Sequence, residues 1–357
     1  MIKHFFDLSK TKFPTNIDLM YKLIVILPIF HHYLFKNYLK LPFLDFINEI
    51  GNFHLIYWIV ILLTIIGITI TLFNIAPKIG SGMIAFCLLT ITIGCRSCYS
   101  DSRLYIASLL ILLAIYQKDF GIKLLRWQVI ILYFGSGINK LLDPDWQSGI
   151  YMDNWLDYKM NFSLYKEFAT ILPDLLLAQI ISWSVIVIEL LICFCFTKKT
   201  YFKAAIWLGI VMHSSSIVIT NHTFGSFVAA VIISYLAFLE WPKKIIISLP
   251  KTKVSSFAKK YNHIIDPYHT IQILINSSSQ KIELQLKNRW YLNFIALQQI
   301  IIYTPIFYLL VVLLLLFPGY GSIKGIILLI ISVLLLPIVG KLLNYLFTKS
   351  IKHSGSN

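Results

Sequence analysis

Long apolar stretches recur along this chain, and short polar segments separate them. A bilayer core about 30 Å thick needs roughly 20 apolar residues in a helix. About ten stretches meet this criterion, near residues 18–36, 54–74, 79–95, 102–117, 124–142, 169–197, 201–219, 224–241, 293–317 and 321–347. The third, fourth and fifth are short or interrupted by polar residues, so the count falls to eight or nine if one of them is re-entrant or interfacial. The pattern predicts an all-α fold, a polytopic helical membrane bundle of about eight to ten transmembrane helices.

Composition supports this class. Of 357 residues, 58% are hydrophobic and only 13% are charged, which excludes an ordinary water-soluble surface. The 31 Lys and Arg exceed the 16 Asp and Glu, giving a formal charge of +15. In a polytopic protein such an excess usually sits in cytoplasmic loops, so we expect no nucleic-acid partner. Five cysteines within apolar sequence are too few for a disulfide scaffold.

The cations fall on alternate sides of the predicted helices. This distribution predicts a multi-pass protein of a plasma or inner membrane, with both termini cytoplasmic and the acidic 143–167 loop outside. The predicted parts are a cytoplasmic N-terminus (1–16), a transmembrane core (17–243), a basic cytoplasmic segment (244–292), a C-terminal transmembrane helix pair (293–348) and a cytoplasmic tail (349–357). Within the basic segment, residues 269–292 alternate apolar and polar positions around the sequence SSSQK. We interpret them as a β-hairpin or a small cytoplasmic cap.

The candidate chemistry gathers in residues 126–167. Gly135, Ser136 and Gly137 permit close helix contact, and Lys140 follows near the end of the same helix. One interpretation is a lysine at a helix end that pairs with Asp143 or Asp145. The other is a desolvated amine that takes up a proton near neutral pH.

The run YFGSGINKLLDPDWQSGIYM, residues 133–152, resembles the signature of the horizontally transferred transmembrane (HTTM) domain. This domain is the membrane part of vitamin K-dependent gamma-carboxylase and of its bacterial relatives. Further family marks follow in order: Glu189 in an apolar helix, His213 in the next helix, a Phe-rich segment at 224–227, and the sequence LEWPKK. The resemblance covers roughly residues 17–243.

In the carboxylase, a lysine at the position of Lys140 deprotonates vitamin K hydroquinone. Oxygen then converts the hydroquinone into a base that removes a glutamate γ-proton, and the resulting carbanion captures carbon dioxide. The resemblance therefore implies a reduced quinone of the vitamin K or menaquinone type as cofactor, Lys140 as general base, and a site on the extracytoplasmic face. The remaining candidates are Glu189 and His213 as catalytic residues, and Tyr133, Asp145 and Trp146 as cofactor-binding residues.

The sequence also departs from the carboxylase. Residues 100–125 contain no histidine, although the carboxylase has a catalytic histidine upstream of its lysine, and no counterpart of its large luminal domain follows Pro242. The enzyme assignment therefore stays open between a carboxylase-like, quinone-dependent oxygenase of the lyase class and no chemistry. The alternatives are a non-enzymatic membrane partner for maturation or export of a peptide or toxin, and a small-molecule transporter. The expected partners are the lipid bilayer and a peptide or small protein substrate.

Other polar residues allow more than one interpretation. An unpaired carboxylate at Glu189 would cost several kcal/mol, so Glu189 should be neutral, near water, or paired with His213 or a lysine. The aromatic residues of 146–165 form either an interfacial belt or the wall of a quinone pocket. Cys95 and Cys98 form a C-x-x-C, interpreted as a redox pair or as two small apolar side chains. We predict no metal site, because the histidines, His31, His32 and His222 among them, show no metal-ligand spacing.

Overall fold

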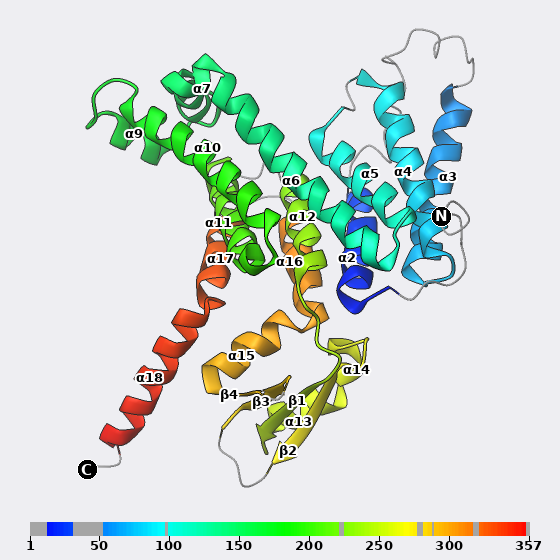
Figure 1. Cartoon of the computed structure of the whole chain (residues 1–357), viewed down its shortest axis with the longest axis vertical. Coiled ribbons are helices and arrows are strands. Elements are labelled where there is room, and N and C mark those ends of the chain that lie inside the picture. The colour runs from blue at the N-terminus through cyan, green and yellow to red at the C-terminus, as the bar shows by residue number, and fades with distance from the viewer. Residues whose placement is uncertain are drawn as a thin grey trace. The chain divides into compact units, whose positions relative to one another are not determined.

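The computed structural model describes residues 13–30, 53–96, 99–220, 225–276, 281–287, 289–316 and 321–354 (Figure 1). His31, His32, Cys98, His222 and Phe224 lie outside the described residues. The chain divides into two compact units. We call the first the helical unit, Met1–Phe238 with Leu315–Gly325, and the second the sheet unit, Leu239–Leu314 with Ile326–Asn357.

The helical unit contains long apolar helices joined by short ones. Its elements are α2 (Thr15–Ile26), η1 (Leu27–Phe30), α3 (Phe53–Leu72), α4 (Pro77–Gly94), α5 (Asp101–Ala114), α6 (Lys118–Leu142), α7 (Pro144–Ser148), α8 (Ile150–Asp153), the π-helix η5 (Asn154–Lys159), α9 (Ser163–Ala169), α10 (Leu176–Thr197), η6 (Lys199–Tyr201), α11 (Phe202–Thr220), α12 (Gly225–Ser234) and η7 (Tyr235–Phe238). In Figure 1, α6 and α10 lie side by side, and they pack against each other along much of their length.

Four segments of the described chain are helical, long and apolar enough to cross a membrane: Leu55–Leu72, Pro77–Gly94, Leu176–Thr197 and Lys199–Ile219. Two helix pairs, bent by 68° and 69°, raise the number to six if each pair is one span. The prediction of an all-α helical membrane fold is confirmed. By length and composition the described residues offer fewer spans than the eight to ten expected. The reason is that α5 and α12 are short, while α6 is interrupted by charged residues.

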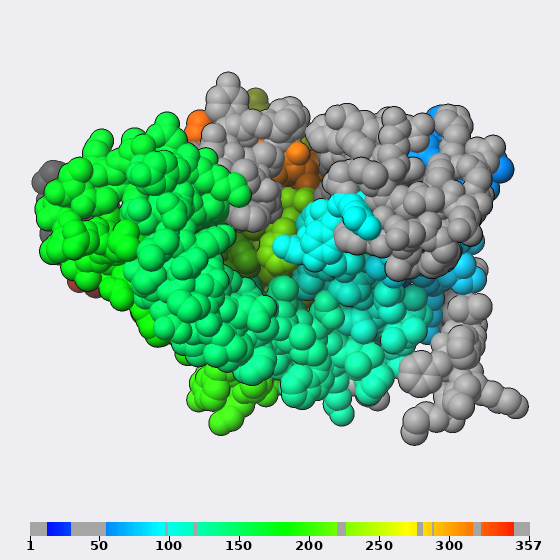
Figure 2. Space-filling view, turned by 90° about the horizontal axis from the view of Figure 1, so that it is seen from above, coloured from blue at the N-terminus to red at the C-terminus, as the bar shows by residue number. Residues whose placement is uncertain are grey.

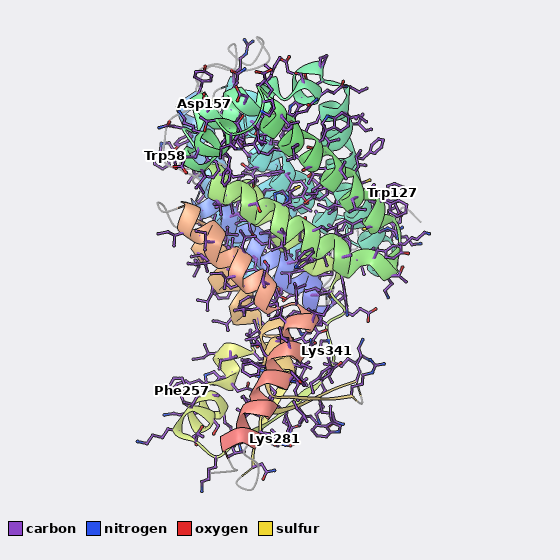
Figure 3. The ribbon with its side chains drawn as sticks, turned by 90° about the vertical axis from the view of Figure 1, so that its left-hand side faces the viewer. Trp58, Trp127, Asp157, Phe257, Lys281 and Lys341 are labelled. Carbon is purple, nitrogen blue, oxygen red and sulfur yellow. The ribbon has the colours of Figure 1, made fainter. Side chains whose placement is uncertain are left out.

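Apolar side chains cover the outside of these helices. On α3, Leu55, Trp58, Leu62 and Ile65 are all exposed. Figure 3 shows Trp58 and Trp127 pointing outward, and each is more than half exposed. Such surfaces suit contact with lipid rather than with water.

The interior of the helical unit is closely packed where small residues face each other. A Cβ on Gly80 of α4 would lie 2.6 Å from the carbonyl oxygen of Gly67 on α3. The two backbones can therefore approach because neither residue has a side chain. Elsewhere, the Asn16 side chain donates to the carbonyl oxygens of Leu236 (3.3 Å) and Ala237 (3.1 Å), which ties α2 to η7.

The predicted outer loop, residues 143–167, is largely helical. Its buried residues Met152, Leu156 and Tyr165 pack with Ala178 of α10, and Trp146 and Trp155 lie against this cluster. Burial, followed by the hydrogen bond that Tyr165 donates to Asp153 at 2.5 Å, raises the pKa of Tyr165. Several of these aromatic residues therefore serve the packing of the loop itself.

Figure 2 shows one face of the molecule. On it, the cyan part of the helical unit near residue 100 and the blue-green part of α6 border a hollow, with yellow-green atoms at its floor. The surface between these two segments is thus concave.

The sheet unit is built on a four-stranded sheet. Its elements are β1 (Ile245–Pro250), α13 (Lys253–Lys260), α14 (Asn262–Ile265), β2 (Ile271–Asn276), β3 (Glu283–Leu286), β4 (Arg289–Leu292), α15 (Asn293–Ile302), and most of α16 (Pro305–Leu316), α17 (Gly321–Leu334) and α18 (Pro337–Ser354). The strand order is β2-β1-β3-β4, with β1 parallel to β2 and antiparallel to β3.

The prediction of a β-hairpin around SSSQK is wrong. The strands before and after it, β2 and β3, do not pair with each other, because β1 lies between them. Ile245 and Ile247 of β1 share one core with the alternate residues of β2 and β3, among them Ile271 and Leu284. The strand between β2 and β3, β1, is therefore strongly apolar. The hairpin of this sheet is formed by β3 and β4.

Substitution of Gly80 by alanine should destabilise the α3–α4 pair, because the added Cβ would push against backbone. Gly82 on the same helix is the matched control, since a Cβ there meets Ala114 at an ordinary 3.7 Å. We expect Gly80→Ala to lower the stability by about 1–3 kcal/mol, the usual cost of overpacking. Thermal unfolding of the purified protein in detergent should show a lower midpoint for Gly80→Ala than for Gly82→Ala, and equal midpoints would contradict this packing.

Candidate functional site

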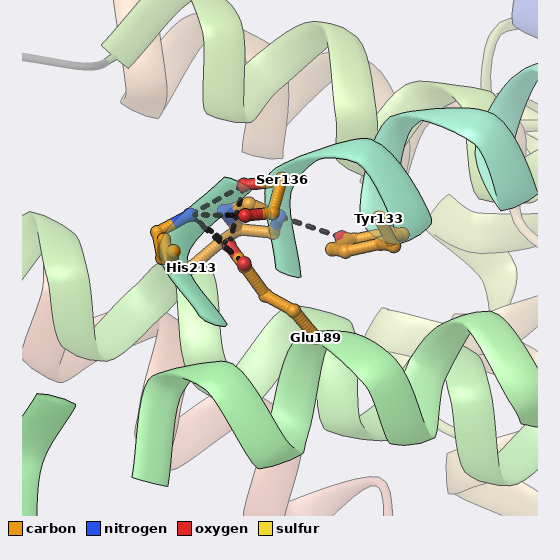
Figure 4. A network of polar contacts seen from close by, with 5 residues as sticks. Tyr133, Ser136, Glu189 and His213 are labelled. Carbon is orange, nitrogen blue, oxygen red and sulfur yellow. Dashed lines mark hydrogen bonds and ion pairs between the residues drawn. The ribbon is translucent and has the colours of Figure 1, made fainter. Parts of the chain in front are cut away.

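The helix α6 places three polar side chains on one face. Tyr133, Ser136 and Lys140 stand three and four residues apart, the spacing at which helical residues line up. The facing helices contribute Glu189 from α10 and His213 from α11. Figure 4 shows Tyr133, Ser136, Glu189 and His213 meeting between the helices.

The centre of the group is an ion pair between Lys140 and Glu189. Lys140 Nζ donates to Glu189 Oε2 at 2.8 Å and to Oε1 at 2.9 Å. Ser136 Oγ donates to Glu189 Oε1 at 3.0 Å and also accepts a short hydrogen bond from Lys140 Nζ. The side chain of Glu189 is 8% exposed and that of Lys140 is 19% exposed. The carboxylate is therefore enclosed, while the amine keeps limited access to its surroundings.

A glycine allows the two helices to come this close. A Cβ on Gly137 would lie 2.8 Å from Cδ2 of Leu190, the residue after Glu189. A Cβ on Gly135 would meet nothing within 4 Å. Close contact, expected for all three small residues, thus depends on Gly137 and on the short side chain of Ser136.

His213 and Tyr133 form the second part of the site. Tyr133 Oη lies 2.7 Å from His213 Nε2, and it shares a short hydrogen bond with the hydroxyl of Tyr235 on η7. All three side chains are buried. Phe227 of α12 packs edge-on against the His213 ring, at 6.2 Å between centroids. The result is a buried chain of hydrogen-bonding groups next to the ion pair.

Trp146 of α7 lies beside the amine of Lys140, at the C-terminal end of α6. Lys140 Nζ lies 5.2 Å from the centre of the Trp146 ring, within cation–π range. The Trp146 ring in turn stacks on Tyr151 at 4.6 Å. A flat aromatic surface therefore adjoins the ion pair.

Asp145 is placed differently. It is exposed in the first turn of α7, and its backbone N–H donates to the Asp143 side chain at 2.9 Å. Asp143 thus caps α7, and in the described structure Glu189 takes the place beside Lys140 that the sequence offered to Asp143 or Asp145.

For two residues of this network, Tyr235 and Ser136, the sequence gives no sign of their hydrogen-bonding role. Tyr235 lies within a continuous apolar run, and its hydroxyl finds room because Gly209 of α11 has no side chain; a Cβ there would lie 2.7 Å from Cζ of Tyr235. The sequence identifies Ser136 only as a small residue that permits close helix contact. Both roles depend on neighbours that are distant in the sequence.

Two further observations concern metals and thiols. Among the described residues, no three His, Cys, Asp or Glu side chains gather closely enough to hold a metal ion. Cys95 is buried just beyond the end of α4, in an apolar cluster with Val60, Cys87 and Ile91.

The network lies within a segment that matches a known family. Residues 119–241 match the family model described as the HTTM domain. Over these residues the chain is similar to the HTTM domain family. The predicted resemblance is thereby confirmed over about a third of the chain, a shorter part than the 17–243 expected. No curated protein and no solved structure matches the chain significantly. Every residue of the polar network falls inside the HTTM segment.

Removal of one partner of the ion pair should cost more than removal of both. Glu189→Leu leaves the ammonium of Lys140 without its counter-charge, and loss of one partner of a buried pair costs about 3–5 kcal/mol. The double variant Lys140→Met/Glu189→Leu should regain most of this stability. Thermal unfolding of the four proteins in detergent forms a double-mutant cycle. Additive effects would contradict a direct interaction.

Proposed function

We propose that the HTTM domain is a membrane-embedded acid–base site that acts on a lipid-soluble substrate bearing an acidic hydroxyl, a reduced quinone being the class that the family implies. The observation that supports this most is the Lys140–Glu189 pair: a proton donor and a proton acceptor in contact, enclosed among apolar helices, with the Lys140 side chain still 19% exposed.

Apolar surroundings change the energetics of such a pair. In water a lysine stays charged beside a carboxylate, but low-dielectric surroundings penalise both charges. The proposal requires that Glu189 can accept the proton of the Lys140 ammonium. The short path between the two groups, 2.8 Å, lets the proton move without rearrangement of the helices.

The contact between Lys140 and Glu189 gives the pair a way to accept a proton from the substrate. Glu189 accepts the proton of the Lys140 ammonium, and the neutral amine accepts the proton of the substrate hydroxyl. At the end Glu189 is protonated and Lys140 is again an ammonium, so one proton has been taken from the substrate and the total charge is unchanged. The restored ammonium lies where it stabilises negative charge on the substrate oxygen.

The groups around the pair suit a flat aromatic diol. Trp146, stacked on Tyr151, offers an aromatic face beside the amine. A bound reduced quinone would supply electrons for the reduction of oxygen. Lys140 and Trp146 are the residues that we propose to hold it, and Asp145, exposed on α7, is a weaker candidate on the same side.

The His213–Tyr133–Tyr235 chain, with Tyr133 in the middle, positions the site. Its hydrogen bonds join α6, α11 and η7 directly behind the ion pair, so they fix the face of α6 that carries Lys140. We assign His213 a role through Tyr133 rather than direct contact with the substrate.

Oxygen-dependent oxidation of reduced menaquinone by the detergent-purified protein tests the proposal. Lys140→Ala should lower the turnover by about a hundredfold or more, the typical contribution of a general base. Lys159→Ala, an exposed lysine on η5, is the matched control and should retain turnover. Equal rates for wild type and Lys140→Ala, or no turnover in the folded wild type, would overturn the proposal in favour of a non-enzymatic partner or a transporter.

Tyr133→Phe should lower the same turnover less than Lys140→Ala does. The substitution keeps the ring but removes the hydroxyl that joins His213 and Tyr235. Loss of these hydrogen bonds should cost about 1–3 kcal/mol. If this cost falls on the positioning of Lys140, the turnover drops roughly tenfold to hundredfold. Tyr158→Phe, at an exposed position, should have no effect. A positioning role further predicts an altered KM for the quinone, and a Tyr133→Phe enzyme with wild-type kinetics would contradict it.

A further inference from the structure

The helix α13 of the sheet unit has an outer face that its own unit does not cover. Val254 is 77% exposed and Phe257 is 62% exposed, unusual values for such side chains. Figure 3 shows Phe257 pointing away from the sheet unit. The Phe257 ring lies against Tyr261, at 4.4 Å between centroids. An apolar surface is thus presented outward.

The opposite face explains how α13 is held. Ser255 is buried, and Ala258, three residues later, packs against the core of the sheet. Thr252 and Ser255 form a reciprocal capping box that fixes where the helix begins. This anchoring leaves Lys253, Phe257 and Lys260, spaced by four and three residues, on the outer face.

Lysines flank the apolar residues. The exposed cations are Lys251, Lys253, Lys259 and Lys260. Residues 243–292 contain nine Lys and Arg against two acidic residues, Asp266 and Glu283. The Asp266 carboxylate is buried and accepts the backbone N–H groups of Ile271 (2.5 Å) and Tyr268 (3.2 Å), while Glu283 lies on β3. Neither acid belongs to α13, so its outer face is strongly positive.

A short amphipathic helix with apolar residues between lysines is typical of binding at a membrane interface. The apolar side chains enter the boundary between headgroups and acyl chains, and each lysine near an anionic surface strengthens the binding. A nucleic acid would use the lysines but would leave Val254 and Phe257 in water. We propose that α13 binds the anionic headgroup surface of the membrane in which the chain is embedded.

Lysine acylation in proteoliposomes tests this proposal. The full chain is reconstituted into vesicles of phosphatidylcholine alone or with phosphatidylglycerol, and a membrane-impermeant amine-acylating reagent is added from outside. Mass spectrometry then gives the rate at each lysine. We expect Lys253 and Lys260 to react at least threefold more slowly in the anionic vesicles. Lys287, an exposed lysine paired with Glu240, is the internal control and should react at the same rate in both.

A variant separates insertion from simple attraction of charge. Val254→Ser/Phe257→Ser removes the apolar contacts but keeps every lysine, and should abolish the protection of Lys253 and Lys260. Leu274→Ser, at an exposed apolar position on β2, should leave it unchanged. Equal acylation in the two kinds of vesicle, or protection that survives in the double variant, would overturn the proposal. Neither readout depends on the chemistry of Lys140.

Discussion

The contact between Lys140 and Glu189 imposes the strictest physical demand on the helical unit. Each charge is tolerable among apolar helices only because the other lies 2.8 Å away. Meeting that demand requires α6 and α10 to approach closely, which Gly137 permits, and requires Ser136 to fill the remaining hydrogen-bonding positions. On the same helix, Tyr133 meets His213 of α11 and Tyr235 of η7.

The same demand defines what the site can do. A fully solvated lysine would hold its proton, and a lysine without a partner would not be stable at this position. The enclosed carboxylate of Glu189 and the ammonium of Lys140, whose side chain is 19% exposed, are in direct contact, and the proposed proton transfer uses this contact. Trp146 and Tyr151 add an aromatic face at the open side of the amine. The proposed proton transfer with a flat, lipid-soluble molecule would use all of these groups.

Much of the fold class and of the candidate site could be predicted from the sequence, because both leave local signals. Apolar stretches of bilayer length predicted the helices, and the lysine within the HTTM-like run predicted the centre of the site. The sequence left the partner of Lys140 open: Asp143 and Asp145 are nearer in the sequence, while Glu189, 49 residues away, was expected to pair with His213 or a lysine. Tyr235 gave no signal, because a tyrosine within an apolar helix is ordinary. In the sheet unit, alternation identified the strands β2 and β3 but not β1 as the strand between them, since alternation carries no information about pairing.

The protonation state of Glu189 is the most direct test of this account. Infrared difference spectroscopy of the purified protein, recorded without oxygen before and after addition of reduced menaquinone, detects the carbonyl stretch of a protonated carboxylic acid. The account predicts that such a band appears on addition and is missing in Glu189→Gln. A spectrum without the band, or the same band in Glu189→Gln, would contradict storage of the substrate proton on Glu189.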